Sequence, residues 1–201
     1  MDLLKGITKE YLNGLEWLNE PCDWGITEKG IYIVPPDNSD FFNDPRRLLN
    51  NDTAPYLYKR VKGDFTARVH VKPCFNKIFN AASIMVYINK NVWAKLCFEW
   101  CDAECSSVVN VVTREISDDA TGPSINAQDV WLQIVRKDNI YAMHWSLDGN
   151  KWLLARNFVL DDTDEVLVGI EGQCPVGNSA KNEYLYLSID PTVPQDIRKG
   201  I

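Results

Sequence analysis

The chain lacks the features that would place it in or across a membrane. No stretch reaches the roughly 18 uninterrupted apolar residues of a membrane-spanning helix, and the N-terminus has no long apolar segment like that of a signal peptide. The sequence therefore predicts a cytoplasmic protein without a membrane partner.

Positive charge is also in short supply. The chain has 21 Lys and Arg against 28 Asp and Glu, a formal net charge of -7 and a pI near 4.9. Proteins that bind nucleic acid need an excess of Lys and Arg to neutralise phosphates. We therefore expect no nucleic-acid partner.

The motifs of several large enzyme classes are missing. The sequence contains no G-x-G-x-x-G, no phosphate-binding loop of the Walker type, no H-E-x-x-H and no G-x-S-x-G. The two histidines, His70 and His144, could each act as a base beside a Ser or Cys nucleophile, but no local signature supports such a pair. We predict no cofactor.

The six cysteines do not form a metal-binding pattern. They stand at positions 22, 74, 97, 101, 105 and 174, with no C-x-x-C pair. On a strand, Cys97 and Cys101 would share a face but lie about 13 Å apart, too far to bind one metal ion. Cys101 and Cys105 could close a disulfide across a hairpin, but a reducing cytosol favours free thiols. We predict no metal site.

What the chain does have is a series of short segments that resemble strands. They cover residues 30–34, 65–71, 82–89, 92–101, 106–115, 129–137, 140–147, 151–160, 165–174 and 183–189. About ten short strands at regular spacing, with no internal helix to connect parallel strands, indicate an antiparallel two-sheet sandwich or jelly roll. A length of 201 residues fits one all-β domain over 1–201, with an N-terminal arm at 1–16 and a C-terminal tail at 190–201.

Three segments interrupt this strand pattern. The first twenty residues predict a short helix or turn followed by an extended segment. Residues 37–54, which hold Phe41 and Phe42, and residues 117–128 predict long polar loops. Loops of this length in a compact domain are often functional.

The strand expected at 92–101 has one apolar face and one mixed face. The apolar face carries Val92, Ala94, Leu96, Phe98 and Trp100, and the other face carries Trp93, Lys95, Cys97, Glu99 and Cys101. The first set is expected to lie in the core. The second set is typical of neither a solvent face nor a core, which makes it a candidate recognition surface.

Acidic residues on this strand raise the question of glycoside hydrolysis, which needs two carboxyl groups about 5–9 Å apart. The next two acids along the chain fall in the expected turn, so they do not share a face with Glu99. Glu171, on a later strand, could do so. Three interpretations stay open at this point: cross-strand ion pairs with Lys95, a ligand-binding face, and a catalytic pair of Glu99 and Glu171.

Aromatic side chains are plentiful. The chain has seven tryptophans and eight tyrosines, and exposed rings can stack on the faces of sugars. Candidate platforms are Trp93, Trp131, Phe41 and Phe42. His144 fits either a hydrogen-bonded structural group or a polar contact to a ligand.

Six ordered motifs carry a resemblance to a known family. They are GDFTARV at 63–69, AASIMVY at 81–87, WAKLCFE at 93–99, SDDAT at 117–121, HWSLDGNKW at 144–152 and VGIEGQ at 168–173. From about Trp17 to Ile189 the chain resembles the regulation-of-enolase family of the concanavalin A-like lectin/glucanase superfamily. The family's usual Asp before the paired alanines is Asn80 here, which argues against an acid role at that position.

This resemblance implies a two-sheet jelly roll with a concave ligand-binding face. It also implies that the strand at 93–99, the segment at 117–121, Arg156 and Glu171 contribute to that face. Fungal relatives look like intracellular proteins that affect enolase, and bacterial relatives look like sugar-associated sandwich domains.

We predict a non-catalytic binding protein, a monomer or weak homodimer, whose ligand is either a carbohydrate or a protein partner such as enolase. The alternative is a glycoside hydrolase in which Glu99 and Glu171 form the acid pair. The predicted ligand-binding residues are Trp93, Lys95, Glu99, Asp118, Asp119, His144, Arg156, Glu171 and Gln173.

Overall fold

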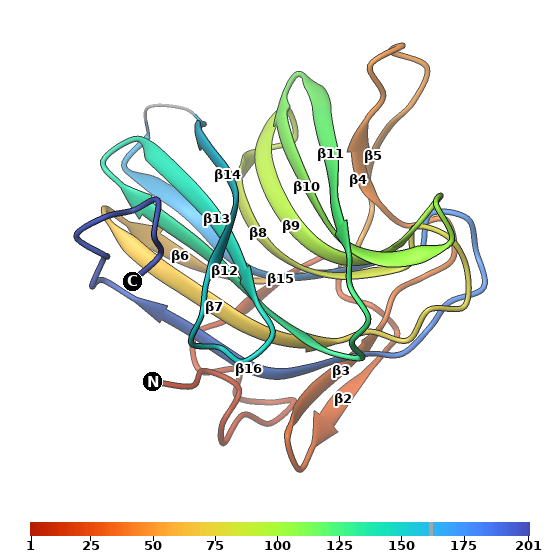
Figure 1. The fold of residues 1–201 in the computed structure, drawn as a ribbon. Coiled ribbons are helices and arrows are strands. Elements are labelled where there is room, and N and C mark those ends of the chain that lie inside the picture. Colours follow the sequence, from red (N-terminus) through yellow and green to blue (C-terminus); the bar gives the residue numbers. More distant parts are fainter. Residues whose placement is uncertain (161–162) are drawn as a thin grey trace.

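Antiparallel strands form two seven-stranded sheets in a computed structural model that describes residues 1–160 and 163–201 (Figure 1). Sheet A has the order β1 (Glu16–Leu18), β6 (Tyr56–Lys62), β15 (Glu165–Gln173), β8 (Ala81–Asn89), β9 (Val92–Cys101), β10 (Cys105–Arg114) and β11 (Ile116–Ser124). Sheet B has the order β14 (Leu153–Val159), β13 (Ile140–Ser146), β12 (Val130–Lys137), β7 (Phe65–Lys72), β16 (Asn182–Asp190), β3 (Gly30–Val34) and β2 (Asp23–Thr27). The strands β4 (Phe41–Asn43) and β5 (Asn50–Asp52) pair as a separate hairpin. The predicted two-sheet, all-β sandwich is confirmed.

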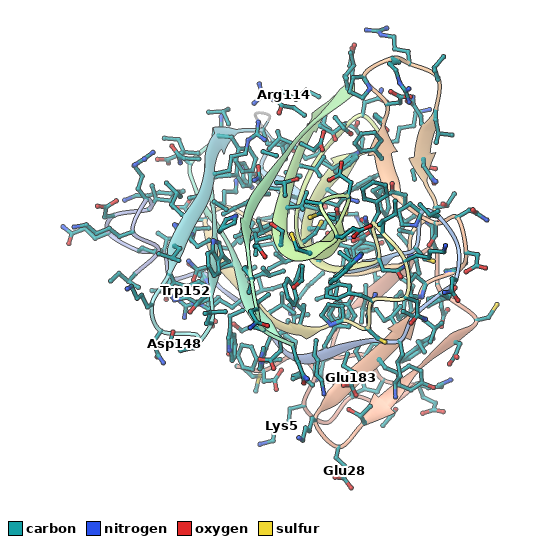
Figure 2. The ribbon with its side chains drawn as sticks, turned by 45° about the vertical axis from the view of Figure 1, so that its right-hand side comes forward. Lys5, Glu28, Arg114, Asp148, Trp152 and Glu183 are labelled. Carbon is teal, nitrogen blue, oxygen red and sulfur yellow. The ribbon has the colours of Figure 1, made fainter. Side chains whose placement is uncertain are left out.

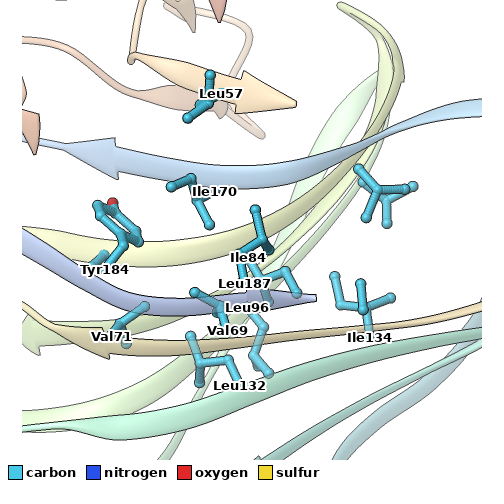
Figure 3. Packing of buried hydrophobic residues seen from close by; sticks show 14 of the residues in the cluster. Leu57, Val69, Val71, Ile84, Leu96, Leu132, Ile134, Ile170, Tyr184 and Leu187 are labelled. Atoms are coloured by element: carbon cyan, nitrogen blue, oxygen red, sulfur yellow. The ribbon is translucent and has the colours of Figure 1, made fainter. Parts of the chain in front are cut away.

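One apolar cluster fills the space between the two sheets (Figure 3). Sheet A contributes Leu57, Ile84, Leu96 and Ile170, and sheet B contributes Val69, Val71, Leu132, Ile134, Tyr184 and Leu187. Most of these side chains come from alternate positions on their strands, because successive residues of a strand point to opposite faces of its sheet. Tyr184 and Leu187 are three residues apart because an irregularity in the register of β16 lies between them. The sandwich is therefore built by the same alternation that the sequence shows.

Strand β9 is buried on both of its faces. Ala94, Leu96 and Phe98 belong to the core between the sheets, as predicted. The opposite face is also shielded from solvent, since its five side chains from residue 93 to residue 101 are all buried. The mixed composition of that face therefore marks an interior with charged groups in it, not an open surface.

Several strands lie where loops were predicted. The segment at 117–128 is mostly β11, which forms the edge of sheet A. This prediction was wrong because β11 is exposed from Asp118 onward, so no apolar alternation marks it, and an edge strand tolerates Pro123. The segment at 37–54 contains the β4–β5 hairpin, and β6 had no prediction at all.

The N-terminal segment forms turns, and no helix occurs in the described part of the chain. Accordingly, the described residues include no helix that is long and apolar enough to cross a membrane. Charged side chains lie around the outside of the sandwich, among them Lys5, Glu28, Arg114 and Asp148 (Figure 2).

The packing of β9 leads to a test of its core face. Replacement Phe98→Ala removes a fully buried ring that meets the edge of Phe75, so we expect the free energy of unfolding to fall by about 3–5 kcal/mol. Replacement Leu48→Ala, at a side chain that is 75% exposed, should change it by less than about 0.5 kcal/mol. Urea unfolding measures the stability of both variants. Equal midpoints for the two variants would contradict the placement of Phe98 in the core.

Candidate functional site

A pocket of about 260 Å³ lies on the face of sheet A that points away from sheet B. Its polar lining comprises Asp40, Lys95, Glu99, Asp119 and Gln173, and its apolar lining comprises Phe42, Phe79, Val109, Val111 and Pro175. Ligand pockets commonly combine an apolar wall with a few converging polar groups. This pocket has that combination, and four of the predicted ligand-binding residues line it.

Strand pairing brings the acids of β9 and β15 onto one face of sheet A. Gln173 and Glu99 lie in the same row across β15, β8 and β9, with Ala81 between them. Glu171 lies in the next row, where it pairs with Ser83. Glu99 and Glu171 therefore share a face, as their alternation predicted.

Lys95 is the centre of the polar network in this pocket. Its side chain is 2% exposed, and its Nζ lies 3.0 Å from Asp40 Oδ1 and 3.9 Å from Glu171 Oε1. Its ammonium group also donates a hydrogen bond to Gln173 Oε1. Burial opposes the charged form of Lys95, but the attraction of Asp40 and Glu171 outweighs it and raises the pKa of Lys95. The lysine is therefore positively charged at neutral pH.

Asp40 reaches Lys95 because the base of the β4–β5 hairpin is held in place. The carbonyl of Asp40 accepts hydrogen bonds from the backbone N–H groups of Thr53 (2.9 Å) and Ala54 (3.2 Å). Farther along, Asn43 Nδ2 donates to the carbonyls of Lys90 (3.2 Å) and Glu115 (3.1 Å), which belong to the turns next to β9 and β10. The hairpin is thus attached to the sheet from which Lys95 projects. Asp40 was not among the predicted site residues, because no local sequence pattern links it to β9.

Gln173 joins the lysine to the second acid of the pocket. Its Nε2 donates to Glu99 Oε2 at 3.3 Å and to the carbonyl of Phe79 at 2.9 Å, while its Oε1 accepts from Lys95. The amide is therefore oriented by partners on both sides. This orientation also ties Phe79, which forms part of the apolar lining, to the polar network.

The two glutamates have raised pKa values. Burial raises the pKa of Glu99 to about 8; Lys95 opposes this shift, and Asp40 adds to it. Burial likewise raises the pKa of Glu171 to about 7, with Lys95 again opposing and Asp40 adding. Among the described residues no donor lies within hydrogen-bond distance of the Glu171 carboxylate oxygens, although the nearby Ser83 hydroxyl lowers the pKa of Glu171. The raised pKa values favour the protonated form of Glu99 at neutral pH, and that of Glu171 to a smaller degree.

Of the candidate aromatic platforms, the pocket uses Phe42. Trp93 and Phe41 are both 0% exposed and pack against each other with ring centroids 5.9 Å apart, so neither ring offers a face to a ligand. Trp131 lies on sheet B, where it stacks on His70 at 4.5 Å. Phe42 is half-buried and lines the pocket.

Asp118 and Asp119 point to opposite faces of sheet A, because they are consecutive residues of β11. Asp119 lines the pocket. Asp118 instead forms an ion pair with Arg156 of β14 (3.2 Å), and Arg156 also donates to Asn110 Oδ1 (3.0 Å). Arg156 and Asp118 thus connect the two sheets at their edges and are not part of the pocket lining.

His144 lies on sheet B, away from the pocket. It is 0% exposed, its Nε2 is 3.1 Å from the carbonyl of Arg198, and its Nδ1 is 3.3 Å from Gln133 Nε2. Burial lowers its pKa. Its environment is that of a structural histidine covered by the C-terminal segment, so the structure does not bring it together with the other predicted site residues.

The acids and thiols of the described residues form no group of three or more that could hold a metal ion. The pocket instead offers acceptors at Asp40 and Asp119, a protonated carboxyl at Glu99, a charged donor at Lys95 and an apolar wall. Such groups can bind a small molecule that has both hydroxyl or amino groups and an apolar face.

The raised pKa values of Glu99 and Glu171 predict a fall in stability with rising pH. Because the folded protein binds these two protons more tightly than the unfolded chain, their contribution is full below the unfolded value of 4.5 and is lost as the pH passes through about 7 and 8. We expect the double variant Glu99→Gln, Glu171→Gln to lose less free energy of unfolding than the parent over this pH range. The difference should be at least about 1.4 kcal/mol, the free energy that corresponds to a shift of one pKa unit. Urea unfolding across this pH range measures it.

The exposed Glu28→Gln serves as the control for that measurement, since it removes a carboxyl group without touching the pocket. It should leave the pH dependence as it is in the parent protein. A double variant with the same pH dependence as the parent would show that the buried acids do not take up the protons.

The chain is similar to proteins from yeast and bacteria. It is 27% identical over 154 residues to "Regulation of enolase protein 1" of Saccharomyces cerevisiae. The aligned residues make up 76% of this chain and 77% of that protein. A crystal structure of a functionally unknown protein from Saccharomyces cerevisiae superposes with a TM-score of 0.84 at 24% identity, over 90% of this chain and 98% of that one.

A bacterial enzyme shares the fold at lower identity. The GH43 protein BlXynB from Bacillus licheniformis superposes with a TM-score of 0.73 at 16% identity, over 90% of this chain. This chain spans 37% of the length of BlXynB, so the likeness concerns one part of that protein.

The family model described as "Protein of unknown function (DUF1349)" matches residues 17–192. This range contains both sheets apart from Glu16, together with the β4–β5 hairpin and every pocket residue. The family resemblance carried by the six sequence motifs is confirmed: the chain belongs to the DUF1349 family.

Proposed function

We propose that this protein is a non-catalytic binding protein that takes a small carbohydrate in the pocket of sheet A. It acts in the cytoplasm as a monomer or weak homodimer. The observation that carries the proposal is the pocket itself, whose lining combines charged and amide groups with Phe42, Phe79 and two valines. A sugar ring has hydroxyl groups at its rim and C–H groups on its faces, and this lining is complementary to both.

The direction of the hydrogen bonds also favours a polyhydroxylated ligand. Asp119 and Asp40 accept hydrogen bonds from hydroxyl groups, and Lys95 and protonated Glu99 donate to them. The volume of about 260 Å³ suits one small ring better than a long chain. The fold shared with part of the GH43 protein BlXynB is in keeping with a sugar ligand.

Hydrolysis is the less favoured function for the same pocket. A hydrolase needs one ionised and one protonated carboxyl group that both reach the substrate. Glu171 is 0% exposed, and Lys95 lies against it.

A protein partner is the second candidate, and enolase is the specific one. Its support is the name of the yeast relative, "Regulation of enolase protein 1", which matches this chain over 76% of its length. Binding of a sugar and regulation of a sugar-metabolising enzyme are compatible roles for one protein, the first at the pocket and the second at the outer surface.

Two neighbouring residues provide a matched test of the pocket. Asp119→Ala removes an acceptor from the lining, whereas Asp118→Ala removes a carboxyl group that is 73% exposed and faces the other way. We expect Asp119→Ala to weaken sugar binding about tenfold or more, because a hydrogen bond to a charged group contributes about 1.5–3 kcal/mol. Asp118→Ala should bind like the parent. Calorimetric titration with a panel of mono- and disaccharides measures both.

Other outcomes of this experiment would overturn the proposal. Equal losses in both variants would place the sugar outside the pocket, and no binding of any sugar by the parent would remove carbohydrate as the ligand. Release of product from aryl glycosides by the parent, abolished by Glu99→Gln, would replace binding with hydrolysis.

The enolase candidate has its own prediction. Purified enolase should form a complex with this protein that sediments faster than either component, and the complex should change the rate of the enolase reaction. Asp119→Ala should form the same complex, because the enolase contact is proposed to lie outside the pocket that Asp119 lines. Independent sedimentation of the two proteins, with unchanged enolase activity, would reject enolase as a partner.

A further inference from the structure

Two cysteines face each other at the end of the β9–β10 hairpin. Cys101 is the last residue of β9, Cys105 is the first residue of β10, and the two are directly paired in the strand register. Their Sγ atoms are 3.5 Å apart. Directly paired residues of antiparallel strands have Cα atoms about 4.5–5.5 Å apart, which lies inside the range that a disulfide can span.

The surroundings prepare this pair for reaction with a small oxidant. Cys105 is partly exposed, whereas Cys101 is buried and its thiol donates a hydrogen bond to the carbonyl of Cys105 (3.1 Å). Cys105 is thus the more exposed residue of the pair. The three-residue turn between them already fixes their distance, since Glu104 N–H donates to the carbonyl of Cys101 at 3.0 Å.

We propose that Cys101 and Cys105 form a redox-active dithiol that hydroperoxides oxidise to a disulfide. The thiolate of Cys105 attacks one oxygen of the hydroperoxide, so an S–O bond forms, the O–O bond breaks and an alcohol (or water, for hydrogen peroxide) leaves. The sulfur of Cys101 then attacks that of Cys105, so the S–S bond forms, the S–O bond breaks and water leaves. The two thiols lose two electrons, and the peroxide gains them.

The dithiol lies next to the wall of the pocket. Cys101 follows Glu99 by two positions on the same face of β9. The carbonyl of Trp100, between them, accepts a hydrogen bond from Phe79 N–H (2.6 Å), and Phe79 lines the pocket. Oxidation therefore modifies the strand end that supports the pocket, although the inference about the thiols does not depend on any ligand there.

The test is to treat the intact protein with hydrogen peroxide, to unfold it, and to alkylate the thiols that remain. We expect four of the six cysteines to be alkylated, two hydrogens to be lost from the mass, and peptide mapping to join Cys101 to Cys105. A dithiol reductant should restore all six thiols. Six alkylated cysteines after a dose that oxidises a free thiol peptide would overturn the proposal.

Two variants separate this pair from the other thiols. The double variant Cys22→Ser, Cys74→Ser removes the two exposed cysteines and should still form the link within the hairpin. Cys105→Ser should lose that link while keeping its fold, because Cys105 is already partly exposed. A mapped bond between any other two cysteines, or a reversible loss of two thiols in Cys105→Ser, would assign the chemistry elsewhere.

Discussion

Lys95 carries an ammonium group into the middle of a seven-stranded sheet, where its side chain is 2% exposed. An unpaired charge in such a place would be strongly unfavourable, so the position requires acceptors close by. They come from two segments: Asp40 from the hairpin base, and Gln173 and Glu171 from the C-terminal end of β15. The pocket exists because these segments meet around one lysine.

The acids around this lysine outnumber it, and that imbalance determines their chemistry. Burial raises the pKa values of Glu99 and Glu171, and a single lysine that also pairs with Asp40 does not offset this effect, so these groups hold protons near neutral pH. The pocket consequently offers donors as well as acceptors from side chains of the same type. This variety of polar groups in a small volume is what distinguishes it from an ordinary ion-pair cluster on a sheet.

The sequence was informative wherever the controlling pattern was local. Alternation along residues 92–101 was sufficient to place Ala94, Leu96 and Phe98 in the core and to put Glu99 and Glu171 on one face. It could not show what covers the second face of β9, because the covering ring of Phe41 belongs to a hairpin far away in the sequence. For the same reason, the sequence did not indicate that Asp40 lies beside Lys95.

Three predicted site residues show a different limitation. Asp118 and Asp119 were predicted together because the family resemblance implies a role for the segment at 117–121, yet adjacent residues of a strand point to opposite faces, and this strand was predicted to be a loop. His144 belongs to one of the motifs that carry the family resemblance, but it lies on sheet B under the C-terminal segment of the chain. Membership of a motif therefore did not separate side chains that hold the fold from those that line the pocket.

The partners of Lys95 stand 55 and 78 residues away along the chain, so they reach it only when the sandwich is nearly assembled. Until then, Lys95 is a charged residue within an otherwise mostly apolar strand sequence, VWAKLCFEW. A charge in such a segment opposes pairing with the same strand of another molecule. The group that holds the finished pocket together thus also protects the unfinished chain against aggregation.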